Sequence, residues 1–208
     1  MMDQPRVERA VIAGRAGLMV GGGRASDVLF APVTPEDAPR LRVGMGQLSS
    51  MSRYFRFLSD VQELSEEQIE RFTHPDQVDH VAWGALDASR PGLPGLGLGR
   101  MIRETEQPRV AELALAVVDA AQGRGVGRVL LAILLARAET MGLDHVHAWV
   151  APENRKVIGW FGRLGAAWVR GDEPWEARFA IPYAAATGSA QAARLAATIA
   201  AVRAVVNP

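Results

Sequence analysis

The spacing of hydrophobic and polar residues along the chain predicts alternating strands and helices. Short apolar runs rich in Val, Leu and Ala, bounded by Gly, Pro or Asp, are typical of strands. We predict strands at residues 27–33, 79–87, 95–103, 108–120, 143–151, 166–172 and 176–182. Segments that favour helix are residues 34–48, 49–60, 64–76, 125–141, 154–165 and the alanine-rich end of the chain after Pro182.

Local signals support where several of these helices begin and end. Thr34 precedes Pro35, which pairs an N-cap residue with proline at the first helical position. Ser65 and Gln68 have the spacing of a capping box, in which each side chain bonds the other residue's backbone. Gly165 directly follows a predicted helix, as a C-terminal glycine often does.

These elements predict an α/β fold with one main domain. We expect a mixed, mostly antiparallel sheet, flanked by helices, around a single strand–turn–helix crossover. Residues 1–26 are glycine-rich near their end, so a flexible N-terminal arm or a hairpin turn is expected there, followed by the main domain at 27–182. Residues 183–208 are expected to form a helical tail, which either covers its own domain or forms a homodimer interface.

Composition and charge exclude several classes of function. The 208 residues include 23 Lys and Arg and 23 Asp and Glu, so nothing indicates a general binder of nucleic acid or of a membrane surface. The absence of cysteine rules out disulfides, thiolate metal sites and a cysteine nucleophile. The four histidines are scattered, and no metal site is expected. Because the chain has neither a secretion signal nor a long uncharged apolar run, we expect a cytoplasmic protein.

A glycine-rich turn is the first candidate binding site. Gly123, Gly125 and Gly127 lie between the strand at 108–120 and the helix that begins near residue 125. Glycine permits a tight turn and close approach of a ligand, and the free N–H groups at a helix N-terminus bind phosphate. The turn lacks the Gly-Lys-Ser/Thr of a Walker loop and the full GxGxxG of a dinucleotide site. Glycines that serve packing alone are the alternative.

Two motifs resemble those of the GNAT superfamily of acyl-CoA-dependent N-acyltransferases. Gln122, Gly125 and Gly127 form the spacing Gln-x-x-Gly-x-Gly, which is similar to the family's pyrophosphate loop. Residues 154–166 are similar to its N-x-x-A-x-x-L-Y-x-x-x-G-F helix, with departures at Val157, Trp160, Phe161 and Ala166. The resemblance covers residues 27–181 and implies the GNAT fold, in which two central strands splay apart.

The resemblance implies acetyl-CoA as co-substrate. Backbone N–H groups of the glycine turn would hold the pyrophosphate, the preceding strand would pair with the pantetheine arm, and Asn154 would contact that arm. The implied binding residues are Ala116, Val117, Val118, Gln122, Gly123, Arg124, Gly125, Val126, Gly127, Arg128 and Asn154. The side chains of Arg128 and Arg155 are further candidates for the CoA phosphates, with ordinary solvated arginines as the alternative.

Glu112 is the candidate catalytic residue. A lysine amine is largely protonated at pH 7, so acylation benefits from a base in a partly apolar site. Glu112 stands in an otherwise apolar strand, where several GNAT branches have their glutamate; an exposed strand residue is the alternative. Phe161 occupies the position of the family's proton-donating tyrosine and cannot donate. His145 and His147 are alternative donors, His80 is a weaker one, and a structural role is open for each.

One branch of the superfamily fits more closely. Segments 33–41, 49–58, 64–73 and 79–86 follow the order seen in bacterial Pat-type protein lysine acetyltransferases. Its strongest marker is the arginine-aromatic segment at 53–57, which an ordinary amphipathic helix explains equally well. The resemblance implies transfer of acetyl to a protein lysine, for example in an acyl-CoA synthetase, by direct attack in a ternary complex. Small amines are alternative acceptors, and a non-catalytic acyl-CoA-binding module is the alternative outside the enzymes.

Overall fold

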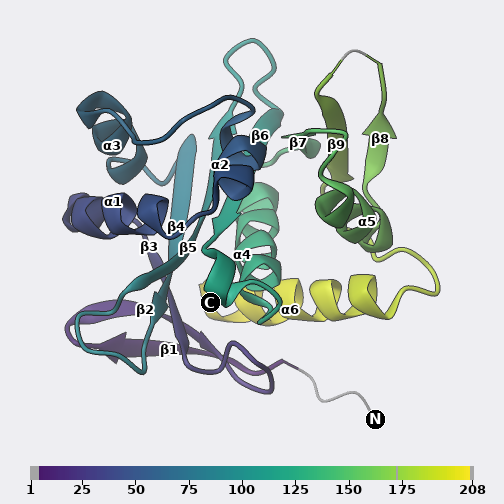
Figure 1. Ribbon diagram of the computed structural model, residues 1–208. Helices are drawn as coiled ribbons and strands as arrows, with labels where there is room; N and C mark the ends of the chain where they lie inside the picture. The colour runs from purple at the N-terminus through teal and green to yellow at the C-terminus, as the bar shows by residue number, and fades with distance from the viewer. Residues whose placement is uncertain (1–4, 172, 207–208) are drawn as a thin grey trace.

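The computed structural model describes residues 5–171 and 173–206, which fold around one continuous nine-stranded sheet (Figure 1). The strand order across the sheet is β1-β2-β3-β4-β5-β6-β7-β9-β8. The strands are β1 (Val7–Ile12), β2 (Arg15–Val20), β3 (Val28–Pro32), β4 (His80–Asp87), β5 (Gly95–Arg103), β6 (Val110–Val117), β7 (His145–Val150), β8 (Ala167–Val169) and β9 (Trp175–Ala180). Every neighbouring pair is antiparallel except β6 and β7, which run parallel. The predicted mixed, mostly antiparallel α/β fold is therefore confirmed.

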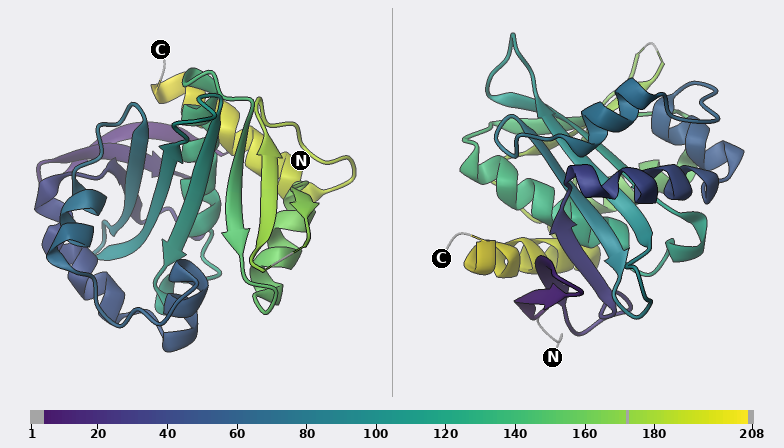
Figure 2. Two further views of the ribbon diagram at one scale, coloured as in Figure 1. Left: turned by 90° about the horizontal axis from the view of Figure 1, so that it is seen from above. Right: turned by 90° about the vertical axis from the view of Figure 1, so that its left-hand side faces the viewer.

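Helices flank this sheet on both faces (Figure 2). The α-helices of the described residues are α1 (Ala38–Gly46), α2 (Ser50–Phe57), α3 (Glu66–Thr73), α4 (Val126–Thr140), α5 (Arg155–Leu164) and α6 (Ala190–Val206). Two short 3-10 turns, η1 (Pro35–Asp37) and η2 (Asp119–Ala121), precede α1 and α4. α4 packs against β4, β5 and β6, and α6 packs along α4, whereas α1 and α2 contact β5 and β6 from the opposite face.

The main core lies between α4 and the sheet. α4 is apolar and buried around most of its circumference, as expected for a helix that is covered on several sides. Glycines in β5 let α4 and β6 come close, because a Cβ on Gly97 would lie 2.8 Å from the Ala116 carbonyl oxygen. A Cβ on Gly99 would lie 3.1 Å from the side chain of Leu134. These two glycines set the spacing between α4 and the strand that carries the candidate site.

The C-terminal helix covers its own chain. α6 packs against α4 and contacts β1, and its buried side chains include Leu195, Ile199 and Val202. This packing favours the covering role over the homodimer interface that was the other expectation for the tail. Throughout residues 5–171 and 173–206, no helix combines the length and the apolar character needed to cross a membrane.

The flexible N-terminal arm is a wrong expectation for most of its length. Residues 7–20 form the β1–β2 hairpin, which pairs with β3 through Leu18 and Met19 and buries Leu18 and Val20. Its two-residue turn has positive φ at Ala13 and Gly14, the backbone that matches a tight hairpin. The sequence interpretation emphasised the later glycines, 21–23, instead of this turn. Residues 1–4, the predicted strand end at Asp172 and tail residues 207–208 lie outside the described residues.

The predicted helix boundaries are confirmed where capping chemistry indicated them. The Ser65 hydroxyl accepts from the Gln68 N–H at 3.2 Å, and the Gln68 side chain accepts from the Ser65 N–H at 2.9 Å. Thr34 is the extended N-cap of η1, which leads directly into α1. Gly165 ends α5 in the left-handed conformation with φ of 90°. α1 and α3 lie on the face of the sheet that carries Glu112, whereas α5 packs against α6.

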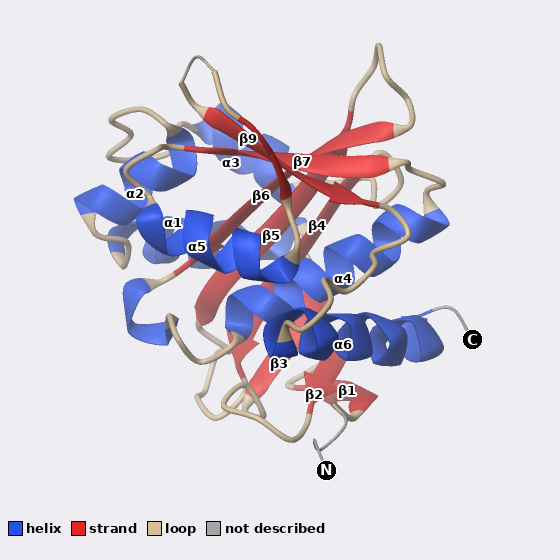
Figure 3. Cartoon of the chain, turned by 90° about the vertical axis from the view of Figure 1, so that its right-hand side faces the viewer, coloured by secondary structure: helices blue, strands red, loops and turns tan. Residues whose placement is uncertain are grey.

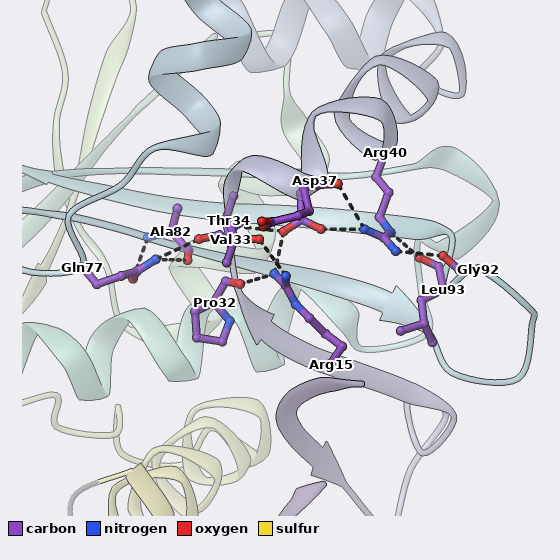
Figure 4. A network of polar contacts seen from close by, with 11 residues as sticks. Arg15, Pro32, Val33, Thr34, Asp37, Arg40, Gln77, Ala82, Gly92 and Leu93 are labelled. Carbon is purple, nitrogen blue, oxygen red and sulfur yellow. Dashed lines mark hydrogen bonds and ion pairs between the residues drawn. The ribbon is translucent and has the colours of Figure 1, made fainter. Parts of the chain in front are cut away.

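A buried carboxylate ties the N-terminal hairpin to the first helix (Figure 4). Asp37 accepts hydrogen bonds from Arg15 at 2.6 Å, from Arg40 at 3.0 Å and from the Thr34 N–H at 3.0 Å. Arg15 also donates to the Thr34 hydroxyl at 2.7 Å. The Asp37 side chain is only 12% exposed, so these donors replace water that it has lost. The network fixes α1 above the sheet.

Replacing Asp37 with Ala should lower the free energy of unfolding by about 2–4 kcal/mol, because the half-buried Arg15 would lose its carboxylate partner and the Thr34 N–H would lose its acceptor. Chemical denaturation followed by circular dichroism measures this change. Asp144→Ala is the control, since its ion pair with Arg109 is exposed and should change stability far less. Equal stability losses in the two variants would contradict the structural role of the Asp37 network.

Candidate active site

The parallel strands β6 and β7 separate soon after they meet. Their pairing is limited to Val110–Glu112 against His145–His147. Beyond this point β6 stays paired with β5 up to Val117, and β7 stays paired with β9 up to Val150 (Figure 3). The edge of β6 at residues 113–117 that faces β7 therefore has no strand partner among the described residues. Backbone N–H and C=O groups on such an edge are available to a ligand with amide groups.

The glycine turn lies directly after the unpaired stretch of β6. Gly123 and Gly125 have φ of 76° and 89°, a left-handed backbone that an L-residue with a side chain adopts only with strain. Gly125 is the N-cap of α4 and forms no side-chain cap hydrogen bond. The first N–H groups of α4, at Val126, Gly127 and Arg128, are thus uncapped and point into the turn together with the positive end of the helix dipole. This arrangement suits a phosphate or pyrophosphate.

Gln122 links the turn to β6 and brings a lysine to it. The Gln122 side-chain N–H₂ donates to the Val117 carbonyl oxygen at 3.2 Å and to Asp119 at 3.1 Å. Its side-chain oxygen accepts from the Lys156 ammonium at 2.6 Å. Lys156 stands in the first turn of α5 and was missed by the sequence interpretation, which considered Arg155 instead. The sequence could have indicated Lys156 as a candidate for the CoA phosphates, because it directly follows Asn154 and Arg155.

The arginines of the turn have different roles in the structure. The Arg124 guanidinium forms two 2.8 Å hydrogen bonds with Asp27 in the β2–β3 loop, so only its backbone faces the turn. Arg128 is half-buried, and its buried Nε has no hydrogen-bond partner among the described residues. Burial and the nearby positive charge of Arg194 on α6 lower the pKa of Arg128. Arg155 is exposed.

Asn154 and Phe161 hold α5 in place. Asn154 is buried, and its side-chain oxygen caps α5 by accepting from the Val157 N–H at 3.2 Å. Its amide N–H₂ is the part that can still meet a ligand. Phe161 is buried edge-on against Phe179, with ring centroids 5.2 Å apart. Its ring supplies packing and no proton, in keeping with the expectation that it is not a donor.

Glu112 is the last residue of β6 that pairs with β7. It is exposed, and it lies in a cross-strand row with Ile102 on β5 and His147 on β7. Its charged neighbours on this face are Arg56 of α2 and Arg100 of β5. The negative charge of Glu112 acts on both guanidinium groups and partly offsets the lowering of their pKa by burial. The structure thus places Glu112 in cationic rather than apolar surroundings, on the face of the sheet that α1, α2 and α3 cover.

Of the three candidate proton donors, His147 is the best placed relative to Glu112. It pairs in register with Glu112, so both side chains point to the same face of the sheet. The ring is buried, Nε2 lies 2.6 Å from Glu104, and Nδ1 lies 3.8 Å from Glu176 without a hydrogen-bond partner. His145 lies two residues earlier on β7, further from the point where the strands part. Burial and the charge of Arg100 lower the pKa of His80 to about 4, which leaves it neutral near pH 7.

A largely apolar cavity of about 90 Å³ lies beside this site, between helices α1, α2 and α3 and the sheet. Leu98 and Ala116 are among the residues on its sheet side. Arg56 and Phe72 also line it and bring it next to Arg100 and Glu112. The cavity lies against one face of β6, and the unpaired edge of the same strand is open toward β7. Two substrates can therefore reach β6 from different directions at the same time.

The chain belongs to the acetyltransferase (GNAT) domain family, which matches residues 27–167. This match confirms the resemblance found in the glycine turn and in the helix that follows Asn154. Residues 27–167 therefore form a GNAT-type acetyltransferase domain.

The chain is also similar to acetyltransferases named Pat. It is 33% identical over 141 residues to acetyltransferase Pat from Mycolicibacterium smegmatis, a match of 68% of this chain and 41% of Pat. It is 29% identical over 130 residues to acetyltransferase PA5475 from Pseudomonas aeruginosa, covering 62% of this chain and 69% of that protein. The crystal structure of the GNAT domain of S. lividans PAT superposes with a TM-score of 0.68 at 30% identity, covering 84% of this chain and 97% of that chain.

The residues present fit acetyl-CoA, which GNAT acetyltransferases use. The uncapped start of α4 and the left-handed glycines suit the pyrophosphate, and Lys156 adds a positive charge beside them. The unpaired edge of β6 suits the amide groups of the pantetheine arm. Across residues 5–171 and 173–206, no group of His, Asp and Glu has the arrangement of a metal site.

Gly125→Ala should weaken acetyl-CoA binding by roughly 5- to 30-fold, because about 1–2 kcal/mol is needed to hold an alanine in the left-handed conformation. Isothermal titration calorimetry measures the Kd. The control is Gly142→Ala, at the far end of α4, where φ is also positive at 68° and no atom lies within 4 Å of the added Cβ. Equal affinity of wild type and the Gly125 variant would contradict the assignment of the turn.

Proposed function

We propose that this GNAT enzyme transfers acetyl from acetyl-CoA to a primary amine, the side chain of a protein lysine. The observation that carries the proposal is the place of Glu112, on the strand that also offers a free backbone edge and leads into the glycine turn. A base is thereby set beside the point where β6 and β7 separate. The similarity to acetyltransferases named Pat, and the Pat-type order of segments 33–86, support a lysine acceptor.

In the proposed complex the two substrates occupy opposite sides of β6. The turn at residues 122–128 and the N-terminus of α4 bind the pyrophosphate, and the β6 edge at 113–117 orients the pantetheine arm. Acetyl-CoA supplies an activated acetyl thioester. The amine enters from the face covered by α2 and α3, where Glu112 is exposed. Such an arrangement brings the two reactants together in one ternary complex.

The chain's own residues then manage the protons. Glu112 accepts the proton that an ammonium group must lose before its nitrogen can attack the acetyl carbonyl carbon directly. After the attack the C–S bond breaks and the acylated nitrogen releases its second proton to solvent; His147, next to Glu112 in the parallel register and held by Glu104, is the proposed donor to the departing thiolate. This role replaces that of a tyrosine, because Phe161 stands at that position and has no ionisable group.

A small-molecule amine is the second candidate acceptor. The cavity beside Arg56 supports a small acceptor, because the cavity volume of about 90 Å³ suits a compact group. A peptide array and a panel of small amines, each assayed with acetyl-CoA, separate these acceptor classes. Acetylation of amines with no labelling of any lysine peptide would reject the protein lysine as acceptor.

Glu112→Gln should lower kcat by about 10²- to 10⁴-fold, because the amide keeps the shape of the side chain but cannot accept the proton. The Kd for acetyl-CoA should stay unchanged, since Glu112 lies outside the glycine turn. Steady-state kinetics and calorimetry give the two values. Glu106→Gln, at an exposed position in the β5–β6 loop, is the matched control. A Glu112→Gln enzyme with wild-type kcat would show that another group removes the proton.

His147→Gln should lower kcat by about tenfold or more, as expected for loss of a general acid, with the KM for acetyl-CoA unchanged. His145→Gln should retain wild-type kcat, because its position on β7 is further from Glu112. Thermal denaturation confirms that both variants are folded. Equal kcat values for wild type and a folded His147 variant would assign His147 a purely structural role.

A further inference from the structure

Two arginines beside Glu112 lack a carboxylate partner. Arg100 projects from β5 on the same face as Glu112, and Arg56 reaches this face from α2. Neither forms an ion pair within the part of the chain that the structure describes, although arginines such as Arg40, Arg42 and Arg103 do. Glu112 forms no ion pair with either arginine, so its carboxylate lies beyond salt-bridge distance from both guanidinium groups. Its single charge faces two positive ones.

The environment of the two guanidinium groups is partly desolvated. Both side chains are half-buried, and the buried Nη1 of Arg100 has no hydrogen-bond partner among the described residues. Arg100 stacks on the ring of Phe72, with its guanidinium carbon 4.4 Å from the ring centroid, and Arg56 lies 6.0 Å from the same centroid. Burial and the neighbouring charge of Arg56 lower the pKa of Arg100 to about 10, which still leaves it charged near pH 7.

A pair of such guanidinium groups is unfavourable without an anion. Burial removes water from the charge, and like charges repel more strongly in a medium of lower dielectric constant. A carboxylate relieves both costs, because an arginine fork donates two parallel hydrogen bonds to its oxygens. Phe72 fixes the orientation of Arg100, so the donors of Arg100 are already arranged before a ligand arrives.

We propose that Arg56 and Arg100 bind a carboxylate of the acceptor, next to the amine that is acetylated. This inference rests on the proposed function and names the acceptor class: an amine with a neighbouring carboxylate. Two sources share this chemistry, namely an Asp or Glu beside a lysine in a protein and the α-carboxylate of a free amino acid. The same arginines disfavour a lysine that is flanked by other basic residues.

The test compares three peptides that differ only in the residues on either side of a single lysine: Asp, Asn or Arg. Wild type should acetylate the Asp-flanked peptide with kcat/KM at least about tenfold above the Asn-flanked one, the value of one charge-assisted contact. The Arg-flanked peptide should be the poorest. Calorimetry of each peptide with the enzyme–CoA complex should give the same order of Kd, independently of turnover.

Arg100→Met and Arg56→Met should reduce the preference for Asp over Asn to about twofold or less, because methionine keeps the apolar contact but offers no donor. Arg42→Met is the matched control: this α1 arginine already pairs with Glu66, and its removal should leave the preference unchanged. Thermal denaturation shows which variants are folded, and Arg100→Lys, which keeps the charge, should retain an intermediate preference.

The outcomes separate the two proposals. Equal acetylation of all three peptides would overturn the carboxylate site and leave the lysine acetyltransferase standing. A uniform loss of kcat in the arginine variants, with the Asp preference intact, would also overturn it and indicate that the arginines orient Glu112. Acetylation of free lysine but of no peptide would support the carboxylate site and reject the protein acceptor. Tight acetyl-CoA binding with no acetylated amine at all would reject the proposed function.

Discussion

The short contact between β6 and β7 is the constraint on which the site depends. A parallel pair that ends at Glu112 leaves the next residues of β6 with backbone groups that the sheet does not satisfy. The same strand remains fixed by β5 on its other edge and by α4 above it, with Gly97 and Gly99 permitting that close packing. The divergence is therefore rigid, and it presents a pre-arranged edge to an extended ligand. The glycine turn follows directly, so one continuous segment carries an unpaired strand edge and a turn whose geometry suits an anion.

Charge is distributed unequally on the two sides of this segment. On the side of the turn, Lys156 and the start of α4 offer positive charge to phosphate groups. On the opposite side, Arg56 and Arg100 surround Glu112 with more positive charge than its carboxylate can balance. A chain with zero net charge thus contains two local cationic sites, which its composition alone conceals. In our proposal, one site binds the acetyl donor and the other selects the acceptor.

Features that depend on local pattern could be predicted from the sequence, and features that depend on packing could not. The strand and helix order, the capping box at Ser65 and the glycine turn all follow from residues close together in the chain. For residues 1–26 the sequence left a flexible arm and a hairpin turn as alternatives and did not locate the turn, because Ala13 is not a residue type that usually marks a turn with positive φ. Arg56 of α2 and Arg100 of β5 both lie over the ring of Phe72 of α3, and no spacing in the sequence indicates that these three elements meet. Hydrophobic periodicity could indicate that these elements exist, but not which of their polar side chains would meet.

The most direct test of the central claim is hydrogen–deuterium exchange with and without acetyl-CoA, read by mass spectrometry at peptide resolution. The account predicts slower exchange at residues 113–117, where the β6 edge gains a partner, and at residues 122–128, where N–H groups bind the pyrophosphate. The β1–β2 hairpin at residues 7–20 should exchange at the same rate in both states. Binding of acetyl-CoA that leaves exchange in both predicted segments unchanged would contradict the account.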